Sequence, residues 1–310
     1  MMNMYNFKNH PLYQVHTLDS VFNSVWYFYK NNFAKLFAMS LMMAAVLQYA
    51  ASFIDFASLQ NETDINVIIE KMQEFIVPIG IIAAINIFFS VIIQHYILFN
   101  PLDENSSILN SFLGSFKYLL PYIVTIILLS IFGVMAMALG AIFIIGIIFA
   151  AIYVITLYMF ILPIMMMESI DISHTINRTF KLAHKNLWTN FGWVAVFMAL
   201  FILISIFISA LILAPFTGNF LRSIFNPDEA ANIVEISKTP LYIALSVIAN
   251  AITMPLIPMF STLLYLNGRA KEDGNAQNHI FGNEERKITV EDLYAKPYID
   301  DYPERRQEHD

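Results

Sequence analysis

A small set of polar and helix-breaking residues lies inside long apolar segments of this chain, where such residues are costly. They are three side-chain amides, an imidazole, a hydroxyl and two prolines: Asn86, Gln94, Asn250, His95, Thr253, Pro255 and Pro258. Inside a membrane, amides and hydroxyls bond helices together or line a cavity. An imidazole can accept a proton near neutral pH. A proline removes a backbone donor and so frees a carbonyl that could face a ligand.

Each of these candidates also has a purely structural interpretation. The amides could hold neighbouring helices together, and His95, near the end of its segment, could be an interfacial anchor. The kink expected at Pro255 could be filled by neighbouring Ser or Thr side chains. No Asp, Glu, Lys or Arg is expected in mid-span, although ion- and proton-coupled carriers usually keep one there. The sequence therefore leaves both helix packing and a cavity open.

Residue patterns that carry enzyme chemistry are absent from the sequence. There is no cysteine, and no HExxH, GxSxG, GxGxxG or phosphate-loop pattern occurs. His174 and His184 are ten positions apart, which is not the spacing of a helical metal pair. We therefore expect no catalytic residues, no metal and no cofactor, and we classify the chain as a non-enzyme.

The class of the protein follows from one charge-free segment. Tyr118 to Met167 contains no Asp, Glu, Lys, Arg or His. As a helix it would be about 75 Å long, whereas the apolar core of a bilayer is about 30 Å thick. The segment must therefore cross the membrane, turn and cross again.

Four further charge-poor segments give six predicted spans in a polytopic, all-α membrane protein. Their ranges are about 34–54, 76–99, 119–138, 141–163, 190–214 and 241–266, arranged as three hairpins. The composition agrees, because 58% of the 310 residues are hydrophobic and only 13% are charged, against about 25% in soluble domains. We expect Gly140, or alternatively Gly133, to form the turn of the middle hairpin, with Gly140 as a left-handed cap.

The positions of Lys and Arg predict the orientation. All of them except Lys71, Arg222 and Lys238 fall in segments on one side of the six predicted spans, together with both termini. Because positive loops stay inside, both termini are expected in the cytoplasm. The net charge of −7 disfavours nucleic-acid binding.

Three cytoplasmic segments have the periodicity of amphipathic helices that lie in the headgroup region. One is in the N-terminal segment 1–33, and the others cover about 105–117 and 170–187. Expected interfacial anchors are two tryptophans and three cations: Trp26, Trp188, Arg178, Lys181 and Lys185. The first and third segments align without a gap, so we interpret the chain as three repeats of an interfacial helix followed by a hairpin. Such repeats occur in transporters and also in passive scaffolds.

The remaining segment, 267–310, is rich in charge and poor in apolar periodicity. We expect it to be a mostly disordered cytoplasmic tail. A short exterior helix is predicted at about 227–237, because Asn226, Pro227 and the following acids are typical of a helix start. The predicted organisation is thus an N-terminal segment (1–33), a six-span domain (34–266) and a tail (267–310).

Two stretches resemble a known family. The first runs from Pro163 to Phe191 and includes Glu168, Arg178, Thr179, Lys181, Leu182 and Trp188; the second is Leu263 to Gly274. They resemble the uncharacterised bacterial six-span proteins that include the membrane domain of some glycerophosphoryl diester phosphodiesterases. The resemblance implies a bacterial membrane fold. Asn267 departs from the pattern, where the family often has Asp. The family's catalytic barrel is a separate domain with no counterpart here, so no hydrolase residues are carried over.

Two functions are consistent with these observations. The first is a non-enzymatic, membrane-organising or accessory component of the bacterial cytoplasmic (inner) membrane, with membrane lipids as partners and a protein partner bound through the tail. The alternative is a transporter or lipid-handling protein with a cavity near the sixth span. The first predicts a structure without a through-going polar cavity. The second predicts a polar or amphiphilic cavity reached by Asn86, Asn250 or the kink at Pro255.

Overall fold

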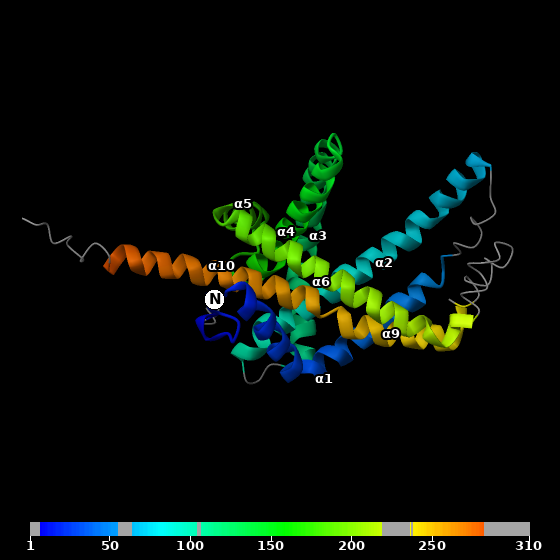
Figure 1. Ribbon diagram of the computed structural model, residues 1–310, viewed down its shortest axis with the longest axis horizontal. Helices are drawn as coiled ribbons and strands as arrows, with labels where there is room; N and C mark the ends of the chain where they lie inside the picture. The colour runs from blue at the N-terminus through cyan, green and yellow to red at the C-terminus, as the bar shows by residue number, and fades with distance from the viewer. Residues whose placement is uncertain (1–6, 55–63, 104–106, 219–235, 237, 282–310) are drawn as a thin grey trace, which may run out of the picture. The chain divides into compact units, whose positions relative to one another are not determined.

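The computed structural model describes residues 7–54, 64–103, 107–218, 236 and 238–281 (Figure 1). These residues are helical or in short connections, and no strand occurs among them. The α-helices are α1 (Leu18–Ala51), α2 (Ile65–Phe99), α3 (Ile108–Gly140), α4 (Ile144–Met167), α5 (Ile172–Lys185), α6 (Leu187–Leu213), α9 (Pro240–Thr253) and α10 (Leu256–Phe281). Three 3₁₀ turns accompany them: η1 (Phe7–Asn9), η3 (Asn100–Leu102) and η4 (Ala214–Phe216).

Within the part of the chain that the structure describes, six helical segments are long and apolar enough to cross a membrane. They are Ser20–Ala51, Ile65–Leu102, Ile108–Gly140, Gly146–Met167, Leu187–Phe216 and Pro240–Gly274. Each of the six predicted spans falls within or overlaps one of them. The prediction of an all-α, multi-pass membrane protein with six spans is therefore confirmed.

Polar caps set where the helices begin. The Thr17 hydroxyl accepts from the backbone N–H of Ser20, and the Ser20 hydroxyl accepts from that of Thr17, which forms a reciprocal cap at the start of α1. Single caps begin α2 at Asp64 and α3 at Ser107. At α9, Thr239 is the cap and Pro240 takes the first helical position, where a missing donor costs nothing.

Only one of the three predicted interfacial segments is a helix of its own. The first is continuous with the first span in α1, and the second is continuous with the third span in α3. The third is α5, which ends at Lys185 because Asn186 leaves helical geometry. Asn190 then donates to the carbonyls of Leu182 and Ala183, which compensates for the backbone bonds lost at the break.

The sixth span is broken in the middle. Helix α9 ends at Thr253 and α10 begins at Leu256, with Met254 and Pro255 between them (Figure 1). Pro255 cannot donate a backbone hydrogen bond, which interrupts the helical bonding, although Met254 keeps helical dihedral angles of φ −54° and ψ −39°. The helical interruption expected at Pro255 is therefore present.

Buried side chains concentrate at one end of the bundle, which we call the Glu168 end. There α2 is buried at Val91–Gln94 and Tyr96–Leu98, and α4 is buried over most of 156–166. Helix α10 is buried throughout 259–267. The opposite halves of α2 and α6 instead expose large apolar side chains, including Ile76, Val77, Ile202 and Phe207. Such surfaces are favourable against lipid.

Helices α3 and α4 pack on each other and form a hairpin with its turn at 141–143. Gly140 ends α3 as predicted, but it is not a left-handed cap, since no described glycine has a positive φ. Steric constraints explain instead why glycine occupies position 140. A Cβ at Gly140 would lie 2.7 Å from the carbonyl oxygen of Gly146 and 2.8 Å from the Cβ of Ala150. Small residues therefore permit this close approach.

Replacing Gly140 with leucine is expected to lower the free energy of unfolding by about 1–3 kcal/mol, the usual cost of overpacking. The side chain would meet backbone atoms of Gly146, which cannot rotate away. The SDS midpoint of unfolding, followed by circular dichroism, measures this effect. Gly80→Leu is the matched control, because a Cβ at Gly80 meets nothing within 4 Å. Equal midpoints for the two variants would contradict the close-approach explanation.

Helix α10 continues well past the predicted start of the tail. Residues 267–281 are helical, whereas the sequence predicts a mostly disordered tail from 267 onward; the boundary of the tail stays a prediction. The chain also divides at this helix into two compact units, Met1–Ala270 and Lys271–Asp310. The expected exterior helix at 227–237, and the disorder expected for 282–310, lie outside the described residues.

Candidate functional site

A cavity of about 520 Å³ lies between the helices, and all six candidate spans contribute to its wall. Its polar lining residues are Asn86, Ser90, Gln94, Tyr122, Tyr158, Asn250, Thr253 and Ser261. Its apolar lining residues are Met43, Ile93, Ile155, Met159, Leu162, Met198, Phe201, Met254, Ile257 and Pro258. The volume lies within the range of about 300–1,000 Å³ typical of small-molecule sites.

Helix α2 contributes a stripe of three polar side chains. Asn86, Ser90 and Gln94 are spaced by four residues, so they lie on one face over about 12 Å of helix. Gln94 is buried and donates from Nε2 to the Thr262 hydroxyl of α10 at 2.6 Å. Asn86 is exposed, and its Oδ1 accepts from the Ser90 hydroxyl at 3.4 Å. The stripe therefore joins two helices at Gln94 and presents an amide to the cavity at Asn86.

The break between α9 and α10 forms another part of the wall. Asn250, Thr253 and Pro258 line the cavity, whereas Pro255 is buried and does not. Near the break, the Tyr29 hydroxyl donates to the carbonyl of Ile252 at 2.8 Å. The hydroxyl of a neighbouring helix thus satisfies this carbonyl, as often happens at proline breaks in membranes.

Four polar lining residues were not among the predicted set: Ser90 of the α2 stripe, and Tyr122, Tyr158 and Ser261. The Tyr158 hydroxyl pairs with Ser130 of α3 at 2.6 Å, and Ser261 bonds to the carbonyl of Met159. Tyr122 extends into the wall from α3. Sequence reasoning concentrated on amides, and Tyr and Ser are common in spans. Only the contact between helices distinguishes these residues from others of their type.

The cavity wall is amphiphilic but carries no fixed charge. Among its lining residues, all in the described part of the chain, none is Asp, Glu, Lys, Arg or His. Amides, hydroxyls and phenols supply donors and acceptors, and methionines and Phe201 supply apolar surface. Such a wall can bind a molecule with both polar and apolar parts.

His95 does not belong to this cavity. Its ring lies against Phe99, at 4.5 Å between ring centroids, and against Gly114 of α3. A Cβ at Gly114 would lie 2.7 Å from His95 Nε2, so glycine is required for the contact. Nδ1 of His95 is buried without a hydrogen-bond partner in the described structure. The ring therefore packs between α2 and α3 rather than facing the candidate ligand site.

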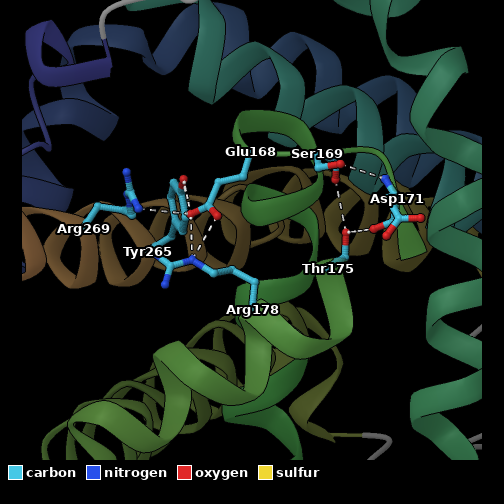
Figure 2. A network of polar contacts seen from close by, with 7 residues as sticks. All are labelled: Glu168, Ser169, Asp171, Thr175, Arg178, Tyr265 and Arg269. Atoms are coloured by element: carbon cyan, nitrogen blue, oxygen red, sulfur yellow. Dashed lines mark hydrogen bonds and ion pairs between the residues drawn. The ribbon is translucent and has the colours of Figure 1, made fainter. Parts of the chain in front are cut away.

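A second polar cluster lies at the Glu168 end and joins three helices (Figure 2). Glu168, which follows α4, accepts from Nε of Arg178 of α5 at 2.9 and 3.1 Å. Two residues of α10 contact the same carboxylate. The Tyr265 hydroxyl donates to it at 3.2 Å, and Nη1 of Arg269 lies 3.6 Å from it. The Arg178 and Glu168 side chains are only 11% and 15% exposed. The cluster fixes α5 and α10 to the end of α4.

Short polar contacts beside this cluster set the start of α5 (Figure 2). Asp171 caps the helix by accepting from the backbone N–H of His174, and Thr175 donates to the carbonyls of Ser169 and Asp171. Asp171 also donates its backbone N–H to the Ser169 hydroxyl. These bonds stabilise the turn between α4 and α5, so that Arg178 lies opposite Glu168.

The N-terminal segment packs against the Glu168 end. His10 is buried. Its Nδ1 accepts a hydrogen bond from the backbone N–H of Leu12, so in the neutral ring the proton is on Nε2. Nε2 donates this proton to the backbone carbonyl of Ile97. Burial lowers the pKa of His10 to about 4, although the bond to Ile97 opposes this shift. Asn267, fully buried in α10, accepts from the backbone N–H of His16. Two histidines thus join the segment to α2 and α10.

The predicted interfacial anchors occupy different environments. Trp26 and Trp188 are 63% and 76% exposed, as an anchor requires. Lys181 and Lys185 are also exposed on α5. Arg178 instead pairs with Glu168 inside the cluster. The buried face of α5 consists of Thr175, Thr179, Leu182 and Ala183, and the helix packs on α3 and α4. Arg178 is therefore better described as a structural cation.

No group of three or more His, Cys, Asp or Glu side chains able to hold a metal occurs in the described ranges. Comparison with known proteins finds no matching family model, no matching curated protein and no matching solved structure. The resemblance to the membrane domain of glycerophosphoryl diester phosphodiesterases thus stays a prediction. The two stretches that suggested it meet in the structure, because Glu168 contacts Tyr265 and Arg269.

Proposed function

We propose that this protein binds a membrane-derived amphiphile in its cavity and acts as a transporter or lipid-handling protein. The observation that carries the proposal is the cavity wall, which all six candidate spans share. It contains the polar residues Asn86, Gln94, Asn250 and Thr253, which come from two different spans. A passive scaffold does not require these polar side chains to line a common cavity.

The two roles considered for the amides can be separated residue by residue. Gln94 acts between helices, because its bond to Thr262 joins α2 to α10. Asn86 and Asn250 are exposed at the cavity rather than buried between helices. Methionines make up part of the remaining wall, and their flexible side chains adapt to irregular apolar ligands. Cavity binding therefore accounts for the two exposed amides, which helix packing does not explain.

The membrane setting belongs to the same proposal. We place the protein in the bacterial cytoplasmic membrane with both termini inside, following the distribution of Lys and Arg. The Glu168 end is then cytoplasmic, and Trp26 and Trp188 lie at headgroup level as anchors. Asn86 and Asn250 face the part of the cavity farther from the cytoplasm. Membrane lipids are the partners, and the protein itself performs no catalysis.

A second candidate function is the accessory or membrane-organising role. It is favoured by the division of the chain at α10, which makes Lys271–Asp310 a unit of its own. In this role the second unit binds a protein partner. Removing residues 271–310 tests it: a partner that copurifies with the full chain and is lost from the truncated one would support this function, whereas unchanged copurification would exclude the second unit as its binding site.

A single introduced thiol tests the cavity proposal. The chain has no cysteine, so Asn250→Cys creates one reactive site facing the cavity. We expect N-ethylmaleimide to modify this thiol slowly in protein extracted with its lipids, and several-fold faster after the lipids are removed, because an occupant shields it. Asn177→Cys, at an exposed position of α5, is the matched control and should react equally in both states. Equal rates at position 250 would contradict an occupied cavity.

A further inference from the structure

We infer that the cavity selects an uncharged amphiphile whose polar head is a hydroxyl or a carboxamide. This inference rests on the proposed function and adds the chemical class of the ligand. It follows from three properties of the wall: the absence of charge, the hydrogen bonds already formed within it, and the kind of apolar surface it offers.

Charge is the most discriminating property. The lining residues carry amides, hydroxyls and phenols but no side chain charged at neutral pH. A phosphate, carboxylate or ammonium head that entered this space would lose water and find no counter-ion. An uncharged head loses far less on leaving water and regains hydrogen bonds inside. The wall therefore discriminates against ionic lipids and inorganic ions.

Several polar groups of the wall already have partners within the protein. Gln94 donates to Thr262, Ser261 donates to the carbonyl of Met159, and Thr253 donates to the carbonyl of Ala249. The exposed side-chain amides of Asn86, toward the middle of α2, and of Asn250, near the C-terminal end of α9, form none of these three bonds. An amide both donates and accepts, so its best partner does the same, as a hydroxyl or carboxamide does.

The rest of the wall suits a hydrocarbon chain. Met43 lies on α1, Met198 lies on α6 one turn from Phe201, and Met254 lies between α9 and α10. Thioether side chains repack around flexible apolar chains at low cost. The polar face on α2 and α9–α10 and this apolar face together match a molecule with a small neutral head and an acyl or isoprenoid-like tail.

The test uses three probes that differ only in the head. Each has a sixteen-carbon chain with a photoreactive diazirine and an alkyne: the alcohol, the sulfonate and the trimethylammonium salt, the last two charged at every pH. Trace amounts are added to the full-length protein in lipid nanodiscs, and crosslinked peptides are identified by mass spectrometry. We expect the alcohol to label peptides containing Met198 or Met254 about tenfold more than either charged probe.

The outcomes separate the two proposals. Equal or stronger labelling of the cavity peptides by a charged probe would overturn the ligand class and leave the binding function standing. Labelling of lipid-exposed peptides alone, by all three probes, would overturn the binding function itself. A charge-introducing variant checks the site: Asn250→Lys should shift cavity labelling toward the sulfonate, whereas Asn177→Lys on α5 should not. Asn86→Lys repeats the check from α2.

Discussion

Replacing Glu168 with alanine is expected to lower the free energy of unfolding by about 3 kcal/mol, the lower end of the cost of breaking a buried ion pair. The carboxylate faces Arg178 and Arg269 and accepts from the Tyr265 hydroxyl. Its removal leaves two partly buried guanidinium groups close together without the anion. The lower end applies because these side chains keep 11–24% of their surface exposed.

The SDS midpoint of unfolding measures this loss. Glu168→Gln should cost less than Glu168→Ala, because the amide oxygen can still accept from Tyr265 and Arg178. Glu74→Ala, at an exposed position of α2, is the matched control and should remain within about 0.5 kcal/mol of the natural chain. If Glu168→Ala behaves like Glu74→Ala, the cluster does not hold α5 and α10 to α4.

Lowering the pH from 6.5 to 4 is expected to remove about 3 kcal/mol of stability through His10 alone. Burial lowers its pKa from 6.5 to about 4, so across this window the unfolded chain binds a proton that the folded chain excludes. The stabilisation is complete above 6.5 and is lost as the pH falls through the folded pKa. A proton on Nδ1 would also break the bond from the N–H of Leu12.

The pH dependence of the unfolding midpoint tests this effect against His10→Gln. Carboxylates titrate in the same window, so the decisive quantity is the difference between the two slopes. We expect the slope of His10→Gln to be shallower between pH 6.5 and 4. Asn177→Gln, which changes an exposed residue of α5 that does not titrate, should keep the slope of the natural chain. Identical slopes for all three proteins would show that His10 is not buried as a neutral ring.

The spans were predictable because a bilayer imposes a length and excludes charge. The charge-free segment from Tyr118 to Met167 required a hairpin, and α3 and α4 provide it. Pro255 predicted an interruption because a missing backbone donor acts locally. The continuity of α1 and α3 was not predictable in this way. An amphipathic segment has the same periodicity whether the helix bends at the interface or continues into the span.

The cavity was predictable only in part. Asn86, Gln94, Asn250 and Thr253 stood out because amides and hydroxyls are unusual in apolar segments, and all four line it. Tyr122, Tyr158 and Ser261 did not, because their role depends on which helix faces meet. His95 was a candidate because an imidazole can accept a proton, but its side chain points from α2 toward Gly114 of α3. Residue type indicates candidates, and packing selects among them.

The Glu168 cluster could not be predicted either, because its residues are far apart in the sequence. Its members come from the end of α4, from α5 and from α10, and Glu168 and Tyr265 are 97 positions apart. Arg178 was assigned to the membrane interface because it lies on the polar face of an amphipathic helix. Its pairing with Glu168 could have been suspected only from the family pattern, in which both residues occur. Local periodicity contains no information on such partners.

Mass spectrometry of the full chain, extracted with its native lipids by a detergent-free polymer, tests the central claim most directly. The account predicts one uncharged amphiphile bound in near-stoichiometric amount. It should be retained by Asn177→Leu and lost from the double variant Asn86→Leu/Asn250→Leu, which removes both exposed amides of the cavity. A protein that carries no specific amphiphile, or a double variant that retains it as fully as the control, would contradict the account.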